Sequence, residues 1–177
     1  LSVADIQDGP ILTGLSEKFI RAAIEKEDPD LILMPGDNIA GYLSLTKSAA
    51  ETAIRNVMDI FDDYDIPVAG VFGNHDDENT PLSKAEQVEI YKEYDCYIGW
   101  EGEPMEKSYG NYNIPIYASA DSDQVVYNIW MLDSGNYYID ENGNENGYGF
   151  VYQEALDWYV KTSDELKANN GGQPVPS

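Results

Sequence analysis

The stretch Val71-Phe72-Gly73-Asn74-His75-Asp76 places three polar side chains directly after an apolar run. The run over residues 68–72 has the length and composition of a short buried strand, and Gly73 ends it. Asn, His and Asp can bind a metal ion or move a proton, and His75 is the only histidine in the chain. We therefore expect this strand end to be the centre of a functional site.

Two earlier apolar segments end in the same way. Residues 1–4 are followed by Asp5-Ile6-Gln7, and residues 31–34 are followed by Pro35-Gly36-Asp37-Asn38. Apolar residues recur at helical spacing in the segments that connect the three strands. Short apolar strands that alternate with amphipathic helices predict an α/β fold with a parallel sheet, and ligands bind at the carboxyl edge of such sheets.

The same patterns assign the remaining elements. Helices are predicted over residues 16–27, 50–61, 83–94 and 153–168, with capping boxes that begin at Ser48 and Ser83. Residues 109–118 and 124–132 predict an antiparallel pair, whereas residues 139–149 are rich in Gly, Asn and acids and predict a polar hairpin loop. The residues expected to face inward are Leu15, Phe19, Ile20, Ala23 and Ile24 in the first helix, and Ala155, Leu156, Tyr159, Val160 and Leu166 in the last.

Composition restricts the classes of function. The chain has 177 residues, of which 42% are hydrophobic, so it can bury a core. Its net charge of -23 argues against nucleic-acid binding by its surface, because the phosphate backbone attracts Lys and Arg. No apolar run has the length of a membrane span, and Cys96 alone can form no internal disulfide. The chain begins without Met, so a cytoplasmic and a secreted or cell-surface location both stay open.

The polar strand ends together form a candidate metal site. Carboxylates suit hard divalent cations, and amide oxygens can join them. A carboxylate between two such cations can bridge both, and the pair can then clamp a phosphoryl group. Each residue alone has a simpler interpretation, as a turn residue, a helix cap or a structural histidine. The candidates are Asp5, Gln7, Asp37, Asn74, His75 and Asp76.

Three of these motifs carry a family resemblance. Ala4-Asp5-Ile6-Gln7, Gly36-Asp37-Asn38 and Gly73-Asn74-His75-Asp76 resemble the first three motifs of the calcineurin-like metallophosphoesterases. Segments 111–116 and 131–135 resemble a bacterial branch of that family. The resemblance implies a four-layer α/β/β/α sandwich, two divalent metal ions (Mn, Fe, Zn or Mg), and hydrolysis of a phosphomonoester or phosphodiester by metal-bound hydroxide.

The resemblance also implies roles for individual residues. Asp5 would bind the first metal ion, Asp37 would bridge the two ions, and Asn74 would bind the second. His75 would contact the phosphate and protonate the leaving oxygen. Asp76 would orient His75, and a neighbouring carboxylate can indeed fix the tautomer of an imidazole and keep it cationic.

Two departures from the family pattern change these expectations. Gln7 stands where the family usually has His, and an amide oxygen is a harder and weaker ligand than imidazole, which favours manganese or magnesium over zinc or iron. The later histidines that complete the family's site are also absent, since His75 is the only histidine.

We therefore interpret residues 1–177 as the N-terminal portion of a single metallophosphoesterase domain with an incomplete sandwich. By itself this portion is expected to be inactive and to bind metal weakly or not at all. The alternative is a non-catalytic binding module that keeps the fold. Substrate, metal identity and oligomeric state stay open at this point.

Overall fold

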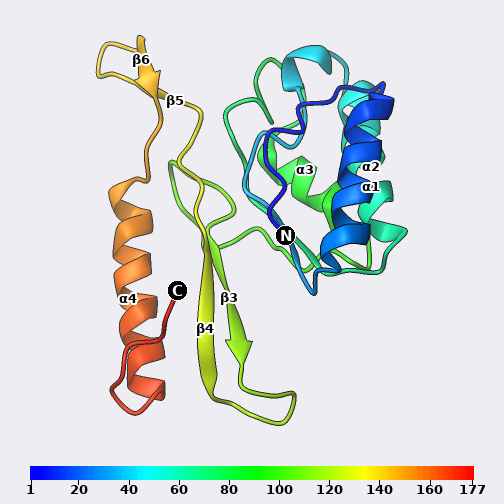
Figure 1. Ribbon diagram of the computed structural model, residues 1–177. Helices are drawn as coiled ribbons and strands as arrows, with labels where there is room; N and C mark the ends of the chain where they lie inside the picture. Colours follow the sequence, from blue (N-terminus) through cyan, green and yellow to red (C-terminus); the bar gives the residue numbers. More distant parts are fainter.

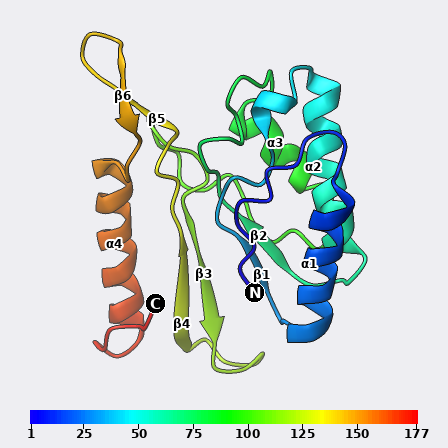
Figure 2. The same cartoon turned by 45° about the horizontal axis from the view of Figure 1, so that its top comes forward.

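The computed structural model describes residues 1–177 and has four layers. The helices are α1 (Gly14–Glu27), α2 (Lys47–Asp62), α3 (Lys84–Tyr91) and α4 (Gln153–Asn169), with a 3-10 turn at Gly41–Leu43. The strands are β1 (Ile32–Met34), β2 (Val68–Gly70), β3 (Tyr112–Tyr117), β4 (Val125–Met131), β5 (Tyr137–Ile139) and β6 (Glu145–Tyr148). Helices α1 to α3 lie on one side of β1 and β2, the β3–β4 ribbon lies on the other, and α4 forms the outer layer (Figures 1 and 2).

The inner parallel sheet is short but has the predicted direction. Strands β1 and β2 pair in parallel from Ile32 opposite Val68 to Met34 opposite Gly70. The predicted first strand is reduced to one parallel bridge between Ser2 and Leu33. All three segments therefore point their carboxyl ends toward the same edge of the sheet.

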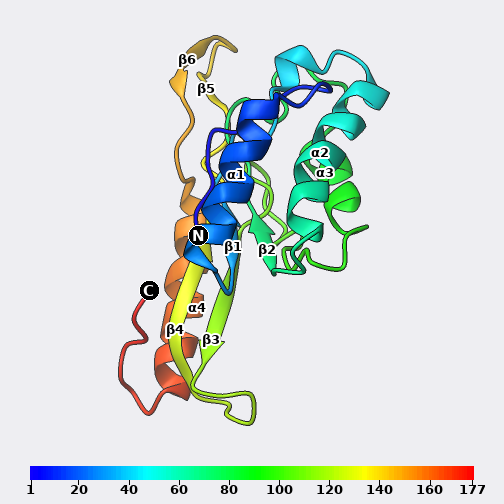
Figure 3. The same cartoon turned by 45° about the vertical axis from the view of Figure 1, so that its right-hand side comes forward.

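Two apolar clusters hold the layers together. The larger one, of 20 buried residues, has members from α1, α2, α3 and both parallel strands. Helices α1 and α2 lie side by side (Figure 3). The smaller one lies between the two sheets and consists of Ala69, Val71, Tyr112 and Met131. Tyr112 also donates a hydrogen bond of 2.7 Å from its hydroxyl to the carbonyl of Gly70, which ties β3 to β2.

Helix α4 packs through only part of the apolar face that was predicted, since Ala155 is buried and Tyr159 contacts Trp130. Trp130 of β4 contacts the rings of Trp158 and Tyr159 at centroid distances of 5.5 and 4.6 Å. Leu156 and Val160 are 42% and 56% exposed, so their predicted inward position is wrong. The helix has only the narrow β3–β4 ribbon to cover, which is too small to bury a whole helical face.

Other differences concern the ends and faces of elements. Helix α2 begins at Lys47, with the side chain of Thr46 as its N-cap in place of Ser48. The capping box of Ser83 and Glu86 is present in α3. Leu15 and Phe19 of α1 are 81% and 74% exposed, contrary to prediction.

The segment that follows β4 forms an antiparallel hairpin. Residues predicted as a polar hairpin loop include part of β5 and all of β6, which pair antiparallel. No helix combines the length and the apolar character that crossing a bilayer requires.

Candidate active site

Three of the predicted ligands converge at the edge of the parallel sheet. The Nε2 atom of Gln7 lies 3.4 Å from Oδ1 of Asp5 and 3.3 Å from Oδ2 of Asp37. All three residues have a left-handed backbone, with φ of 55° for Asp5, 47° for Gln7 and 53° for Asp37. Residues other than Gly rarely adopt such φ values, and strained backbone of this kind clusters at functional sites. The two loops therefore turn sharply at the point where the carboxylates meet.

Two glycines permit this close approach of the loops. A Cβ atom on Gly73 would lie 2.2 Å from Oδ1 of Asp37, and one on Gly36 would lie 2.7 Å from the backbone nitrogen of Gly73. The backbone N–H of His75 donates to Oδ1 of Asp37 at 2.9 Å. The carboxylate of Asp37 is thus held between the loop that follows β2 and the side chain of Gln7.

The donor set at this point fits a hard divalent cation. Asp5 and Asp37 supply carboxylate oxygens, and rotation of the Gln7 amide would present its oxygen in place of Nε2. Asn74 makes no hydrogen bond to these three residues, and its Nδ2 donates to the hydroxyl of Tyr137 at 3.4 Å. Among the described residues, no group of three His, Cys, Asp or Glu side chains is placed to hold a metal ion. The side chains in place thus supply two carboxylates and one amide to an ion at this point.

Asp76 has a different place from the one predicted. It is fully buried, and the hydrogen bond to His75 that was expected of it is absent. Burial raises the pKa of its carboxyl to about 7, and backbone N–H groups oppose that rise. Four such groups donate to its oxygens: those of Asp37 (2.9 Å), Asn38 (2.7 Å), Ile39 (3.0 Å) and Gly73 (2.6 Å). Asp76 therefore joins the loops after β1 and β2 instead of orienting the histidine.

Glu78 takes the position beside His75. Its Oε2 lies 2.5 Å from Nδ1 of His75, and its Oε1 accepts a hydrogen bond of 3.2 Å from the hydroxyl of Tyr137. The ring of Tyr42 contacts the imidazole edge-on, at a centroid distance of 5.3 Å. The signal for Glu78 in the sequence is an acid three residues after the histidine.

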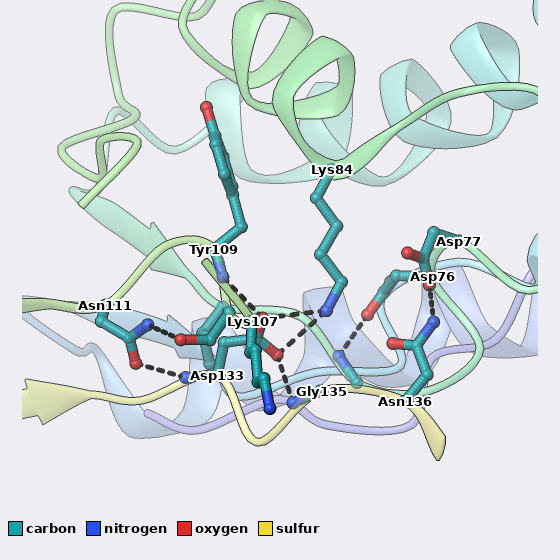
Figure 4. Close-up of polar contacts among 12 residues, drawn as sticks. Asp76, Asp77, Lys84, Lys107, Tyr109, Asn111, Asp133, Gly135 and Asn136 are labelled. Atoms are coloured by element: carbon teal, nitrogen blue, oxygen red, sulfur yellow. Dashed lines mark hydrogen bonds and ion pairs between the residues drawn. The ribbon is translucent and has the colours of Figure 1, made fainter. Parts of the chain in front are cut away.

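A cavity of about 380 Å³ adjoins this loop. The ammonium of Lys84 crosses it to the carboxylate of Asp133, and the amide of Asn136 donates to Asp77 (Figure 4). Its lining residues include Asp77, Lys84, Lys107, Tyr109, Asp133, Asn136, Tyr137 and Tyr152. Most of them come from the second half of the chain, where sequence patterns indicated no site residue.

Comparison with known proteins identifies the family of this chain. The family model for the calcineurin-like phosphoesterase matches residues 3–175. The chain belongs to this family. Calcineurin-like phosphoesterases act on phosphoric ester bonds, so the predicted reaction class agrees with the family assignment.

Several curated calcineurin-like relatives are eukaryotic. The chain is 32% identical over 160 residues to probable inactive purple acid phosphatase 28 of Arabidopsis thaliana, covering 82% of this chain and 39% of that protein. It is 30% identical over 175 residues to probable inactive purple acid phosphatase 29 of the same plant, covering 89% and 41%. Phosphatase DCR2 of Saccharomyces cerevisiae is 29% identical over 126 residues, covering 69% and 21%. These relatives do not support the predicted bacterial branch.

The plant relatives are longer than this chain, and a solved structure shares its fold. The chain spans about two-fifths of the length of the two plant relatives. The crystal structure of a dimetal phosphatase from Danio rerio has the same fold, with a TM-score of 0.58 and 15% identity over 96% of this chain and 65% of that one. The predicted metallophosphoesterase fold is thereby confirmed.

Proposed function

We propose that this chain carries the histidine and the first metal site of a phosphoesterase that hydrolyses a phosphomonoester or a phosphodiester. The observation that carries the proposal is the convergence of Asp5, Gln7 and Asp37, with the loop of His75 bound to the same carboxylate. The family assignment supports the reaction class. Residues 1–177 then form the first portion of the domain, as predicted from the sequence.

Different side chains would bind the cation and donate the proton. Asp5, Gln7 and Asp37 would hold a divalent cation, and such cations in this family neutralise phosphoryl charge and activate water. His75 would donate a proton to the leaving oxygen as the P–O bond breaks, so that the departing group leaves as a neutral alcohol. Its Nδ1 is engaged by Glu78, so the cationic ring would give up the proton on Nε2 and keep the one on Nδ1.

Asn74 would take part only after a local rearrangement. Its side chain now donates to Tyr137 and makes no hydrogen bond to Asp37. Rotation of this amide toward Asp37 would add an oxygen for a second cation beside the first. The second site would still need further donors, because no group of three His, Cys, Asp or Glu side chains is placed to hold an ion.

The proposal is tested by metal content and hydrolysis measured together. The 177-residue chain and the complete product of its gene are loaded with manganese, desalted and analysed for metal, with Asp37→Asn as the control variant. We expect two manganese ions and hydrolysis of 4-nitrophenyl phosphate or its diester for the complete product. We expect at most one weakly bound ion and no turnover for the 177-residue chain, and loss of metal in both forms of Asp37→Asn.

A second candidate function is a binding module that has kept the fold and lost the chemistry. Gln7 in place of an imidazole favours it, and so do the names of the two plant relatives, which call those proteins probable inactive phosphatases. A manganese-loaded complete product that hydrolyses no phosphate ester would establish this alternative. Turnover by the 177-residue chain itself would instead refute the proposal that this chain carries only part of the active site.

Gln7 should determine which metal ion the site prefers. We expect Gln7→His to raise the affinity for zinc roughly tenfold and to change the affinity for manganese less, because imidazole is a softer and stronger ligand than an amide oxygen. Competition with a chromophoric chelator measures both affinities. Gln124→His, at an exposed position outside the site, is the matched control and should leave them unchanged. Equal affinities in the Gln7→His variant and the unmodified chain would show that residue 7 is not a ligand.

A further inference from the structure

The segment that begins β5 reaches back to the loop that carries His75. The hydroxyl of Tyr137 donates to Oε1 of Glu78 at 3.2 Å and accepts from Nδ2 of Asn74 at 3.4 Å. Its neighbour Asn136 donates to Oδ1 of Asp77 (Figure 4). Two consecutive residues of the second half of the chain thus hold the loop over residues 74–78 from one side.

Glu78 connects this segment to the histidine. One carboxylate oxygen lies 2.5 Å from Nδ1 of His75, and the other accepts from Tyr137. A carboxylate with both oxygens engaged cannot rotate without losing a hydrogen bond. Tyr137 in turn stacks on Tyr148 of β6, at a centroid distance of 6.0 Å and an interplanar angle of 27°. The imidazole is therefore anchored through Glu78 to Tyr137 of the β5–β6 hairpin.

The bond between Glu78 and His75 has a chemical consequence. The partner of one ring nitrogen decides which nitrogen carries the proton in a neutral imidazole. An acceptor at Nδ1 keeps a proton there in both the neutral and the cationic ring, so the second proton of the cationic ring is carried by Nε2, the atom that would donate it to the leaving oxygen. Both side chains are partly exposed, 29% for His75 and 25% for Glu78. Packing of the hydrophobic core therefore does not explain why they contact each other.

We propose that Glu78 and Tyr137 are positioning residues that fix the orientation and tautomer of His75. The proposal rests on the function proposed above for the proton-transfer role of His75. The contact itself can be tested without turnover. Tyr137 also contacts Asn74, so it links the orientation of the histidine to that of a candidate metal ligand.

The single histidine makes a direct test possible. The imidazole nitrogens of His75 give one pair of resonances in the ¹⁵N NMR spectrum of the 177-residue chain, recorded at a pH where the ring is neutral. We expect the Nδ1–H form in the unmodified chain and a change toward the Nε2–H form in Glu78→Ala. Tyr137→Phe should give a mixture of the two forms, because the carboxylate then loses one of its two anchors.

Two matched variants separate positioning from general disturbance. Tyr138→Phe removes the hydroxyl of the next residue, which makes no hydrogen bond, and Glu145→Ala removes an exposed acid of β6. Both should keep the tautomer of the unmodified chain. An unchanged tautomer in Glu78→Ala would overturn the proposal, and so would a tautomer that changes equally in Tyr138→Phe and Tyr137→Phe.

A kinetic measurement on the manganese-loaded complete product tests the consequence for catalysis. A poor leaving group needs the proton more than a good one does. We therefore expect Glu78→Ala and Tyr137→Phe to lower kcat about tenfold for phenyl phosphate and less than about threefold for 4-nitrophenyl phosphate. Equal losses on both substrates would overturn the positioning role. If the unmodified product hydrolyses neither, the proposed function fails, and the tautomer alone decides whether Glu78 and Tyr137 position the ring.

Discussion

Asp76→Asn should lower the free energy of unfolding by about 3 kcal/mol, because it leaves buried N–H groups without an acceptor. The carboxylate of Asp76 is fully buried and accepts from four backbone N–H groups in two loops. An asparagine keeps one oxygen but directs an NH₂ group at the N–H groups that the other oxygen accepted. Equilibrium unfolding in urea, followed by far-ultraviolet circular dichroism, measures the change.

The adjacent acid provides the control for this prediction. Asp77 is partly exposed, and its carboxylate accepts only from the amide of Asn136. Asp77→Asn keeps an oxygen for that bond, so it should change stability by less than about 1 kcal/mol. Equal losses in the two variants would show that the loops after β1 and β2 are held together by something other than Asp76.

The role of Asp76 also shows where sequence reasoning reached its limit. A carboxylate next to a histidine can orient the ring, and the sequence offers no reason to prefer another role. The actual role depends on which N–H groups are left unpaired where β1 ends, and only the folded chain shows that Asn38 and Ile39 supply them. Because Asp76 is engaged by these N–H groups, Glu78 is the carboxylate that contacts His75.

The convergence of Asp5, Gln7 and Asp37 could be predicted, because it follows from the direction of the strands. Parallel strands end at one edge of their sheet, so polar residues just after them must lie close together. Asn74 obeys the same rule for its backbone. The direction of its side chain is decided by Tyr137, 63 residues away, and no local pattern contains that information.

Burial of helical faces was predicted less well for a related reason. Periodicity shows that a helix is amphipathic, but not how wide a surface is available to cover it. In α1 the side chains of Ile20 and Ile24 fill the contact with the core, and Phe19 is left 74% exposed. The extent of burial depends on the neighbouring layer, which the sequence of the helix does not describe.

The ion pair between Lys84 and Asp133 should be the other large contributor to stability. The Asp133 side chain is 1% exposed and that of Lys84 is 12% exposed, with Nζ 2.9 and 3.0 Å from the two carboxylate oxygens. Removing one partner leaves a buried charge without compensation. Asp133→Ala should therefore lower the free energy of unfolding by about 4 kcal/mol in the same urea experiment. Loss of a cooperative transition would count as the same result.

A double-mutant cycle separates the ion pair from the other contacts of Asp133, which also accepts from the backbone N–H groups of Tyr109 and Gly135. Lys84→Met combined with Asp133→Ala should lose at least 2 kcal/mol less than the sum of the single losses, roughly the upper range of couplings between contacting residues. The exposed pair of Arg55 and Glu93 gives the comparison cycle, with an expected coupling below about 1 kcal/mol. Since Lys84 belongs to α3 and Asp133 follows β4, a strong coupling would mean that this one contact joins the helical layer to the second sheet. A coupling as small as the surface pair's would assign the stability of Asp133 to its backbone donors instead, and the layers would then be held by the apolar cluster around Tyr112.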